Sequence, residues 1–404
     1  MKKTNKKTKW CKFRHKIIRV VASPIFSILN RTMFGFRGKK FKESRKRNFL
    51  VIANHQTSFD QFYIGQMFKR PVYYVATEDI FSNGFVSKLL RFAVAPIPIK
   101  KQLTDMRAVM NCVKVAKEGG TICLFPEGNR TFSGTTEYFK PAVVKLAKMI
   151  NLPIAFVKIE GGYGVEPRWG YKRRKGKCTA SVTKVVEPEE YRKLSDEQLL
   201  DLINQNIYVD DRAIGREFKS KRLAEYMERC VYVCPKCGLS TFRSNKDEVT
   251  CLKCGMTARY NPDLTFTAIS EDFPFGSVKE WYDYQKDFIN KLDVTTLTSE
   301  PTYTDTVRFS EVRLYKRKLV LEKQATVSLY GDKITVSGEK HSFEFKFDDV
   351  SVVTVLGRNK VNIYYGDKVY QIKPEKRFNA LRYVHFYNRY TNIKEGNGNE
   401  FLGL

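Results

Sequence analysis

Only four histidines occur in this 404-residue chain, and one of them stands near an acidic residue in a pattern suited to proton transfer. His55 is followed by Asp60 in the segment NHQTSFD (residues 54–60). An imidazole whose tautomer is fixed by a carboxylate is an effective general base. We therefore interpret His55 and Asp60 as a candidate catalytic pair. The alternative is an ordinary loop histidine, with Asp60 favoured by the dipole at the start of a helix.

A second candidate segment, FPEGNR (residues 125–130), follows a predicted strand further along the chain. Gly128 permits a close approach of the backbone to a ligand. Arg130 can hold a phosphate through two parallel hydrogen bonds, and Glu127 could orient that arginine or a substrate hydroxyl. The alternative is a plain turn with a solvated arginine.

The elements expected to position these residues alternate between β-type and helical runs, which favours an α/β architecture. Predicted strands cover residues 49–53, 72–76, 97–100, 121–125, 154–158 and 179–186, and predicted helices include 104–117 and 141–150. His55 closely follows the first strand, at the carboxyl end where open α/β sheets place their sites. We expect an α/β domain, a mixed sheet flanked by helices, over residues 48–215.

The two segments resemble two sequence blocks of the glycerolipid acyltransferases, which act on glycerol 3-phosphate or lysophosphatidic acid. NHQTSFD is similar to the HxxxxD block, and FPEGNR is similar to the FPEGTR block, with Asn129 where threonine is usual. IPIKK (residues 97–101) resembles the block that ends in a basic phosphate-binding residue, here Lys101 in place of arginine. LPIAFV (residues 152–157) resembles the apolar final block. The resemblance covers about residues 50–190.

The resemblance implies transfer of an acyl group from acyl-ACP or acyl-CoA to the free hydroxyl of a lysophospholipid, chiefly 1-acyl-sn-glycerol 3-phosphate, giving phosphatidic acid. It implies no catalytic cofactor. His55 and Asp60 take the catalytic roles, and the substrate-binding residues are Lys101, Glu127, Gly128 and Arg130. Two alternatives remain open: acylation of glycerol 3-phosphate or another lysolipid, and a non-catalytic membrane adaptor that retains the fold.

Four of the nine cysteines form two CxxC pairs with 13 residues between them. The pairs are Cys234 with Cys237 and Cys251 with Cys254, a spacing typical of a tetrahedral zinc ribbon. A four-cysteine site leaves no open coordination position, so we expect a structural Zn²⁺. Unliganded thiols are the alternative. A nucleic-acid-binding ribbon is a rival function, but the aromatic-rich basic stripe that it would need is missing beside the ribbon, so nucleic acid is not an expected partner.

The chain is strongly basic, with a net charge of +29, and residues 1–48 hold 17 Lys or Arg against the single acid Glu43. Within the arm 1–47, residues 12–30 place Lys12, Lys16, Arg19 and Asn30 on one narrow stripe of a helix and apolar side chains elsewhere. This pattern is typical of a helix lying on an anionic membrane surface. No uncharged apolar run reaches about 18 residues, so we expect no spanning helix. The alternative is a helix packed on the domain core.

The remaining chain divides into a zinc ribbon at 225–265, a helix and linker at 266–305, a β-rich domain at 306–394 and a tail at 395–404. In the β-rich domain we expect strands at 326–330, 333–337, 342–347, 360–365 and 368–373, and a closing helix at 377–389. This pattern resembles a PH-like or GRAM-like barrel; the alternative is a small sheet that only stabilises the chain. We expect a cytoplasmic protein, peripheral on the inner face of the cell membrane.

Overall fold

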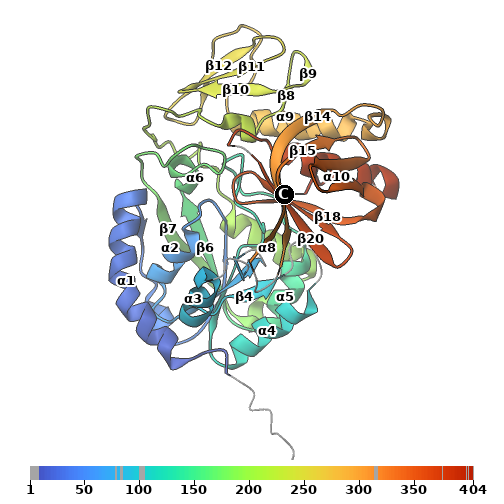
Figure 1. The fold of residues 1–404 in the computed structure, drawn as a ribbon. Coiled ribbons are helices and arrows are strands. Elements are labelled where there is room, and N and C mark those ends of the chain that lie inside the picture. Colours follow the sequence, from blue (N-terminus) through green and yellow to red (C-terminus); the bar gives the residue numbers. More distant parts are fainter. Residues whose placement is uncertain are drawn as a thin grey trace, which may run out of the picture. The chain divides into compact units, whose positions relative to one another are not determined.

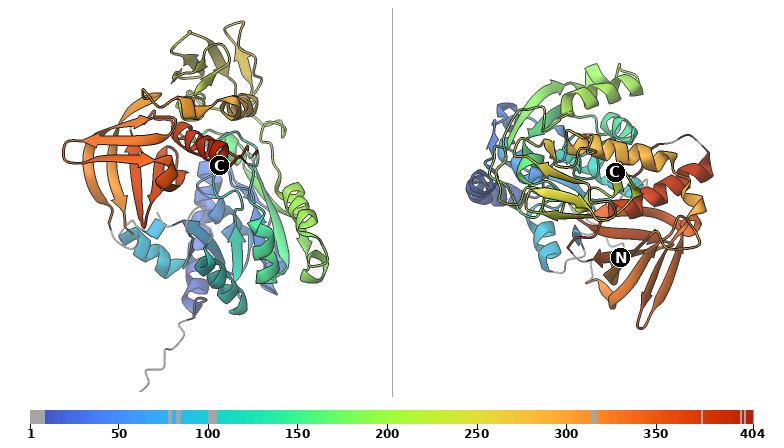
Figure 2. Two further views of the ribbon diagram at one scale, coloured as in Figure 1. Left: turned by 90° about the vertical axis from the view of Figure 1, so that its right-hand side faces the viewer. Right: turned by 90° about the horizontal axis from the view of Figure 1, so that it is seen from above.

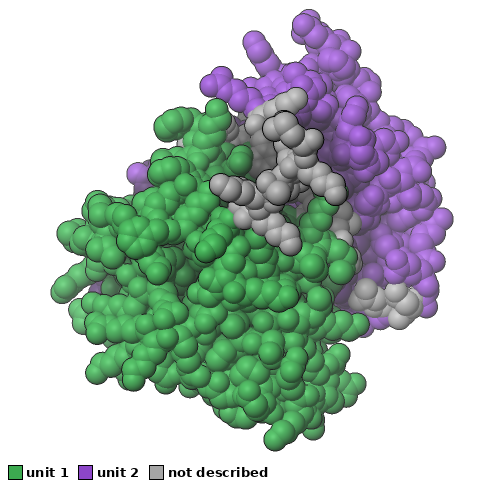
Figure 3. Space-filling view, turned by 90° about the horizontal axis from the view of Figure 1, so that it is seen from below, with its two compact units in different colours: residues 1–129, 138–160, 177–209 green, residues 130–137, 161–176, 210–404 purple. Residues whose placement is uncertain are grey.

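The computed structural model describes residues 9–77, 80–81, 85–99, 105–313, 317–374, 376–396, 398 and 400–403 (Figure 1). The predicted phosphate-binding residue Lys101 lies outside these described residues. The chain divides into two compact units (Figure 3). It passes between them more than once along the sequence. Unit 1 comprises Met1–Asn129, Tyr138–Glu160 and Lys177–Val209, and unit 2 comprises Arg130–Glu137, Gly161–Gly176 and Asp210–Leu404. Each unit is described by itself below.

Unit 1 is built on a seven-stranded mixed sheet with the order β1-β7-β6-β2-β5-β3-β4. Strands β6, β2, β5, β3 and β4 run parallel to one another, whereas β7 is antiparallel to β6. The strands are β1 (Arg37–Gly38), β2 (Leu50–Ala53), β3 (Val72–Thr77), β4 (Ile97–Ile99), β5 (Thr121–Leu124), β6 (Ile154–Glu160) and β7 (Thr179–Val186). The predicted mixed α/β sheet and all six of its predicted strands are confirmed.

Burial explains why the central strands are apolar throughout. Every side chain of β2 is fully buried, as expected for a parallel strand covered on both faces. Helices α4, α5 and α8 pack against one another, and their apolar faces join the same core as β2 and β5. The helices of unit 1 are α1 (Phe13–Phe34), α2 (Asp60–Met67), α3 (Phe85–Ala93), α4 (Met106–Lys117), α5 (Ala142–Ile150), α7 (Pro188–Tyr191) and α8 (Asp196–Ile207), with a 3-10 turn at Lys42–Arg45.

Helix α1 packs on unit 1 through a face that carries both polar and aromatic side chains, including Asn30, Phe26 and Phe34, and leaves much of its apolar surface exposed. Asn30 is fully buried, and the Arg19 guanidinium donates a hydrogen bond to the carbonyl of Phe68. In contrast, Val20 and Ile28 are each 65% exposed. Other exposed apolar side chains on the helix are Phe13, Ile17, Val21 and Ile25. Helix α1 therefore contacts the domain, as the alternative of a helix packed on the core expected, but most of the apolar side chains that such a helix would bury stay exposed.

The expectation that no helix could span a membrane also needs correction. Helix α1 is 22 residues long and continues through Pro24, and it is long and apolar enough to cross a membrane by length and composition alone. The sequence criterion failed because it required an uncharged run, whereas the apolar part of this helix contains Arg19 and Arg31. Only 11% of the most apolar 18-residue window of this helix is buried.

Unit 2 contains a seven-stranded antiparallel sheet with the order β17-β16-β15-β14-β20-β19-β18. The first strand, β14, pairs with the last, β20, and the sheet curls into a half-barrel (Figure 2). Among the described strands, β17 and β18 form its two edges. The strands are β14 (Tyr303–Val312), β15 (Leu319–Leu329), β16 (Lys333–Gly338), β17 (Ser342–Lys346), β18 (Val350–Leu356), β19 (Lys360–Tyr365) and β20 (Lys368–Pro374). The β-rich prediction is confirmed.

The closing helix of the half-barrel, α10 (Leu381–Glu395), begins four residues later than predicted and packs on β18. The predicted start at residue 377 was too early. Asn379 accepts hydrogen bonds from the backbone N–H groups of Leu381 and Arg382, and the helix begins after it. A side-chain acceptor at this position satisfies amides that have no partner within the helix.

The cysteine-rich segment of unit 2 is built from short β-hairpins packed on helix α9 (Val278–Lys291). Trp281 on α9 donates its indole N–H to the carbonyl of Val233, at 2.8 Å, and its ring meets Phe242 edge to face. The strands are β8 (Val233–Cys234), β9 (Gly238–Leu239), β10 (Phe242–Asn245), β11 (Glu248–Cys251), β12 (Thr257–Tyr260) and β13 (Phe266–Ala268). The remaining short elements are α6 (Gly162–Val165) and 3-10 turns at Met227–Arg229, Val294–Thr296 and Phe347–Asp349.

Candidate active site

The two candidate segments leave the carboxyl ends of neighbouring parallel strands. Leu50 of β2 pairs with Ile122 of β5, so NHQTSFD after β2 and FPEG after β5 emerge at the same edge of the sheet. Asn54 fixes the first of these exits, because its side-chain amide both donates to and accepts from the backbone of Ile159 on β6, each at 2.8 Å. His55 therefore starts from a rigid strand end.

The His55 and Asp60 side chains meet as the spacing predicted. The Nδ1 atom of His55 lies 2.7 Å from Oδ2 of Asp60. Asp60 is the first residue of α2 and is fully buried. Its carboxylate also accepts the backbone N–H of Gln56 at 2.6 Å and both the N–H and the hydroxyl of Thr57, the hydroxyl at 2.6 Å. These donors hold the carboxylate in one orientation, and the carboxylate in turn orients the imidazole.

Glu127 connects the two candidate segments within unit 1. Its Oε1 atom accepts the backbone N–H of His55 at 2.7 Å, and Glu127 is 6% exposed. The ring of Phe125 stacks on the His55 imidazole with 4.3 Å between centroids. The FPEGNR pattern predicted that Glu127 orients an arginine or a substrate hydroxyl, and the contact with the His55 backbone has no signal in the local sequence.

Gly128 forms the turn that ends β5. Its N–H donates to the carbonyl of Phe125 at 3.0 Å, and its φ of +65° lies in the left-handed region. An added Cβ would meet no atom within 4 Å, so the backbone conformation, rather than space, favours glycine here.

Arg130 belongs to unit 2 and lies among groups that the sequence patterns did not identify. Its guanidinium lies 3.8 Å from the carboxylate of Glu166, and its backbone carbonyl accepts a 2.9 Å hydrogen bond from Arg168. Glu166 and Arg168 are both nearly fully buried. No local motif marks either residue, and their burial as charged side chains is visible only in the structure.

The loop that follows Arg130 is held by a buried carboxyl group. Glu137 accepts hydrogen bonds from the hydroxyls of Ser133, at 2.8 Å, and Thr131, at 3.3 Å. Burial raises the pKa of Glu137, although the nearby Lys286 and the two hydroxyls oppose this rise. The loop is thus fixed by its own polar network.

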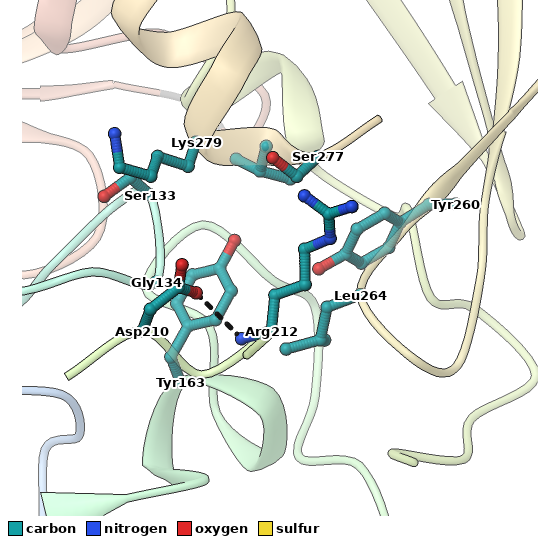
Figure 4. Close-up of a pocket in the computed structure, with 10 residues that line it drawn as sticks. Ser133, Gly134, Tyr163, Asp210, Arg212, Tyr260, Leu264, Ser277 and Lys279 are labelled. Atoms are coloured by element: carbon teal, nitrogen blue, oxygen red, sulfur yellow. Dashed lines mark hydrogen bonds between the residues drawn. The ribbon is translucent and has the colours of Figure 1, made fainter. Parts of the chain in front are cut away.

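A small hollow in unit 2 does not qualify as a substrate site (Figure 4). Its volume is about 10 Å³, enough for a single water molecule. Ser133, Tyr163 and Tyr260 are among the residues that line it, and Asp210 accepts a 3.0 Å hydrogen bond from the backbone of Arg212 beside it. No residue of the NHQTSFD segment takes part in its lining.

The four predicted metal-ligating cysteines are brought together in unit 2. The Sγ atoms of Cys234, Cys237, Cys251 and Cys254 all lie within 4.8 Å of one another, and two pairs are 3.6 Å apart. Four thiolates about 2.3 Å from a common centre would have similar separations, so the donor set fits a tetrahedral Zn²⁺ site. All nine cysteines are free of disulfides.

The part of the chain that carries NHQTSFD and FPEG is similar to known proteins. The family model described as Acyltransferase matches residues 36–160. Curated relatives include a probable 1-acyl-sn-glycerol-3-phosphate acyltransferase of Mycoplasma pneumoniae, 26% identical over 125 residues, and the 1-acyl-sn-glycerol-3-phosphate acyltransferase of Borreliella burgdorferi, 28% identical over 104 residues. These matches cover 30% and 26% of this chain and 47% and 42% of the relatives, so the chain spans less than half the length of each.

A solved structure, that of the 1-acyl-sn-glycerophosphate (LPA) acyltransferase PlsC from Thermotoga maritima, covers 50% of this chain and 78% of its own. Its sequence is 23% identical to this chain and the TM-score is 0.40.

Proposed function

Because residues 36–160 match the family model described as Acyltransferase, we propose that this chain is an O-acyltransferase that acts on a lysophospholipid. The acyl group would come from acyl-CoA or acyl-ACP, and the main acceptor would be 1-acyl-sn-glycerol 3-phosphate, the molecule named in the titles of the curated relatives. The observation that carries the proposal is the 2.7 Å contact between His55 and the fully buried Asp60.

In the proposed reaction His55 is the general base. Asp60 holds Nδ1, so Nε2 is the ring nitrogen that receives the proton of the acceptor hydroxyl. The hydroxyl oxygen attacks the thioester carbonyl carbon, an ester bond forms, and the C–S bond breaks. The imidazolium then gives its proton to the departing thiolate, so no covalent enzyme intermediate is required. The buried Asp60 carboxylate stabilises the imidazolium between the two transfers.

Arg130 and Lys101 are the proposed ligands of the acceptor phosphate. Arg130 follows Glu127 by three residues along the chain, and Glu127 binds the backbone of His55. A guanidinium presents a planar fork that matches a phosphate, whereas Lys101 contributes a compact charge. Gly128 would allow the backbone of the FPEGNR segment to approach the substrate.

A membrane surface is the proposed location of the reaction, on the cytoplasmic side. The support is the outward apolar face of α1 together with the basic character of the arm. An apolar face of this kind is stabilised by entering the lipid interface, and lysines and arginines beside it attract anionic headgroups. The enzyme would then bind the acceptor and release the product at the membrane, where these acyl-chain lipids are most concentrated.

The cysteine cluster is proposed to bind one structural Zn²⁺. Cys234 ends β8, and the carbonyl of the preceding residue, Val233, accepts the Trp281 indole N–H. The metal would therefore stabilise the hairpins that pack on α9. With four protein ligands it would have no open position and no role in acyl transfer.

An acceptor panel tests the proposed function. Purified protein would be given acyl-CoA or acyl-ACP with 1-acyl-sn-glycerol 3-phosphate, glycerol 3-phosphate or an uncharged 1-acylglycerol, and products would be measured by mass spectrometry. We expect the highest kcat/KM with 1-acyl-sn-glycerol 3-phosphate. A higher value with glycerol 3-phosphate would replace the proposed acceptor, and absence of transfer to every acceptor would contradict the enzymatic function.

A further inference from the structure

A buried arginine joins the loop of Arg130 to the half-barrel of unit 2. Arg168 donates from Nη1 to the carbonyl of Arg130 at 2.9 Å and from Nε to the carbonyl of Gly357 at 2.6 Å. Its Nη2 atom lies 3.4 Å from the carbonyl of Val355. Gly357 belongs to the turn between β18 and β19, so one side chain connects segments that are more than 200 residues apart in sequence.

Arg168 is built into the protein interior as a fixed connector. It is 2% exposed, and its guanidinium lies over the ring of Phe132 with 4.3 Å to the centroid. Burial, followed by the proximity of Arg130, lowers the pKa of Arg168 well below its ordinary value. A buried guanidinium needs hydrogen-bond acceptors, and here each of its three nitrogens donates to a backbone carbonyl. The backbone of Arg130 and the β18–β19 turn are therefore held by the same side chain.

A second connection reaches the Arg130 side chain through Glu166. The Glu166 carboxylate lies 3.8 Å from the Arg130 guanidinium and 3.7 Å from that of Arg358, with Arg173 at 3.4 Å. Arg358 follows Gly357 in the β18–β19 turn and also donates to the carbonyl of Tyr171 at 3.1 Å. The β18–β19 turn is therefore connected to Arg130 in two ways. The Gly357 carbonyl binds Arg168, and the Arg358 side chain pairs with Glu166.

We infer that the β18–β19 turn of the half-barrel positions Arg130 for the acceptor phosphate, with Glu166, Arg168 and Arg358 as positioning residues. This inference rests on the proposed function, in which Arg130 binds that phosphate. It gives the C-terminal region a part in acceptor recognition, since the guanidinium fork of Arg130 binds phosphate well only when its orientation is held.

The inference predicts a specific kinetic change in Arg358→Ala. Arg358 is about one-third exposed on its side chain, so its removal should leave the fold intact. We expect the KM for 1-acyl-sn-glycerol 3-phosphate to rise about threefold to tenfold, while kcat and the KM for the acyl donor change less than about twofold. Glu166→Gln should raise the same KM by about tenfold, since it removes the charge shared by the arginines. The matched controls are Arg313→Ala, which breaks the pair with Glu311, and Glu344→Gln, which weakens the pair with Lys333.

A double-mutant cycle separates positioning from general stability. If Arg358 acts through Arg130, the Arg130→Ala Arg358→Ala double variant should have the same acceptor KM as Arg130→Ala alone. Additive effects of the two substitutions on the acceptor KM would overturn the inference. An unchanged acceptor KM in both Arg358→Ala and Glu166→Gln would overturn it as well, and thermal unfolding would verify that each variant is folded.

The same cycle distinguishes failure of the inference from failure of the proposed function. An Arg130→Ala variant with a normal acceptor KM would contradict the phosphate-binding role of Arg130, and the inference with it. A raised KM in Arg130→Ala, combined with no effect of Arg358→Ala and Glu166→Gln, would contradict only the role of the half-barrel turn.

Discussion

Nδ1 of His55 and Oδ2 of Asp60 lie 2.7 Å apart, and Asp60 is held there by donors from its own loop. Asp60→Asn should therefore lower kcat by about 10²-fold to 10⁴-fold, because an amide at this position can bind the wrong tautomer of the imidazole and cannot stabilise its cation. The measurement is steady-state acyl transfer from acyl-CoA or acyl-ACP. Asp201→Asn, on the exposed side of α8, is the matched control and should retain full activity. An active Asp60→Asn variant would show that the carboxylate does not assist the base.

The contribution of Glu127 to activity should depend more on one hydrogen-bond acceptor atom than on its negative charge. Its Oε1 atom accepts the His55 backbone N–H, and glutamine retains an oxygen that can do the same. We expect Glu127→Gln to lose less than about fivefold in kcat/KM and Glu127→Ala to lose about 10-fold to 100-fold. Equal losses in the two variants would assign the effect to the charge instead of the hydrogen bond.

The cysteine cluster should make unit 2 dependent on metal for its stability. Purified protein should contain one zinc per chain by mass spectrometry of the metal, and Cys234→Ser with Cys251→Ser should abolish it. Loss of zinc should lower the melting temperature, because the hairpins on α9 lose their common ligand. Cys11→Ser, a substitution in unit 1, should leave zinc content unchanged. Full stability with no bound metal would exclude a structural site.

Acid should destabilise unit 2 through His385. The pKa of this fully buried histidine is lowered from 6.5 to about 3, first by its burial and then by Lys286. Between these values the unfolded chain holds a proton that the folded chain lacks, so stability is complete above pH 6.5 and is lost as the pH falls. The full slope for one proton is about 1.4 kcal/mol per pH unit.

His385→Gln should reduce that slope, because a side-chain amide binds no proton in this pH range. The amide can still form a hydrogen bond with Tyr232, whose hydroxyl lies 2.7 Å from Nδ1 of His385. Urea unfolding of both proteins at pH 7, 6 and 5 measures the difference. Identical pH dependence in the variant and the natural chain would assign the acid sensitivity to other groups.

The apolar face of α1 should control binding to anionic vesicles. Val20→Glu with Ile28→Glu places charges on the two 65%-exposed positions and should weaken binding at least tenfold, since each buried side chain contributes about 1.5–3 kcal/mol. The control is Ile269→Glu with Leu319→Glu, two exposed apolar positions of unit 2. Vesicle sedimentation measures both. Equal binding by the two double variants would contradict a role for α1.

Much of unit 1 could be predicted because its signals are local. The apolar runs of β2 and β5 mark buried strands, and the residues that follow them carry the family blocks. The positions of Glu166 and Arg168 could not be predicted. Arg168 binds the backbone carbonyls of Arg130, Val355 and Gly357. Every residue has such a carbonyl, so the amino-acid sequence gives no signal of these contacts.

Two other features also escaped local patterns. The amphipathic pattern of α1 identified two faces but not which side chains meet the domain. Arg19 binds the backbone of unit 1, and Phe26 and Phe34 pack on the aromatic side chains of α2. Strands β14 and β18 were missed. In β14 buried and exposed residues alternate imperfectly, because bulges near Val307 and Phe309 shift the pairing with β15.

The base role of His55 is the central claim, and acyl transfer by His55→Ala tests it most directly. Natural protein and variant, both shown to be folded by thermal unfolding, would be assayed with a labelled acyl thioester and 1-acyl-sn-glycerol 3-phosphate. We predict product formation by the natural protein and a loss of at least about 10³-fold in kcat for His55→Ala, with the acceptor KM little changed. Full activity of His55→Ala would contradict the account.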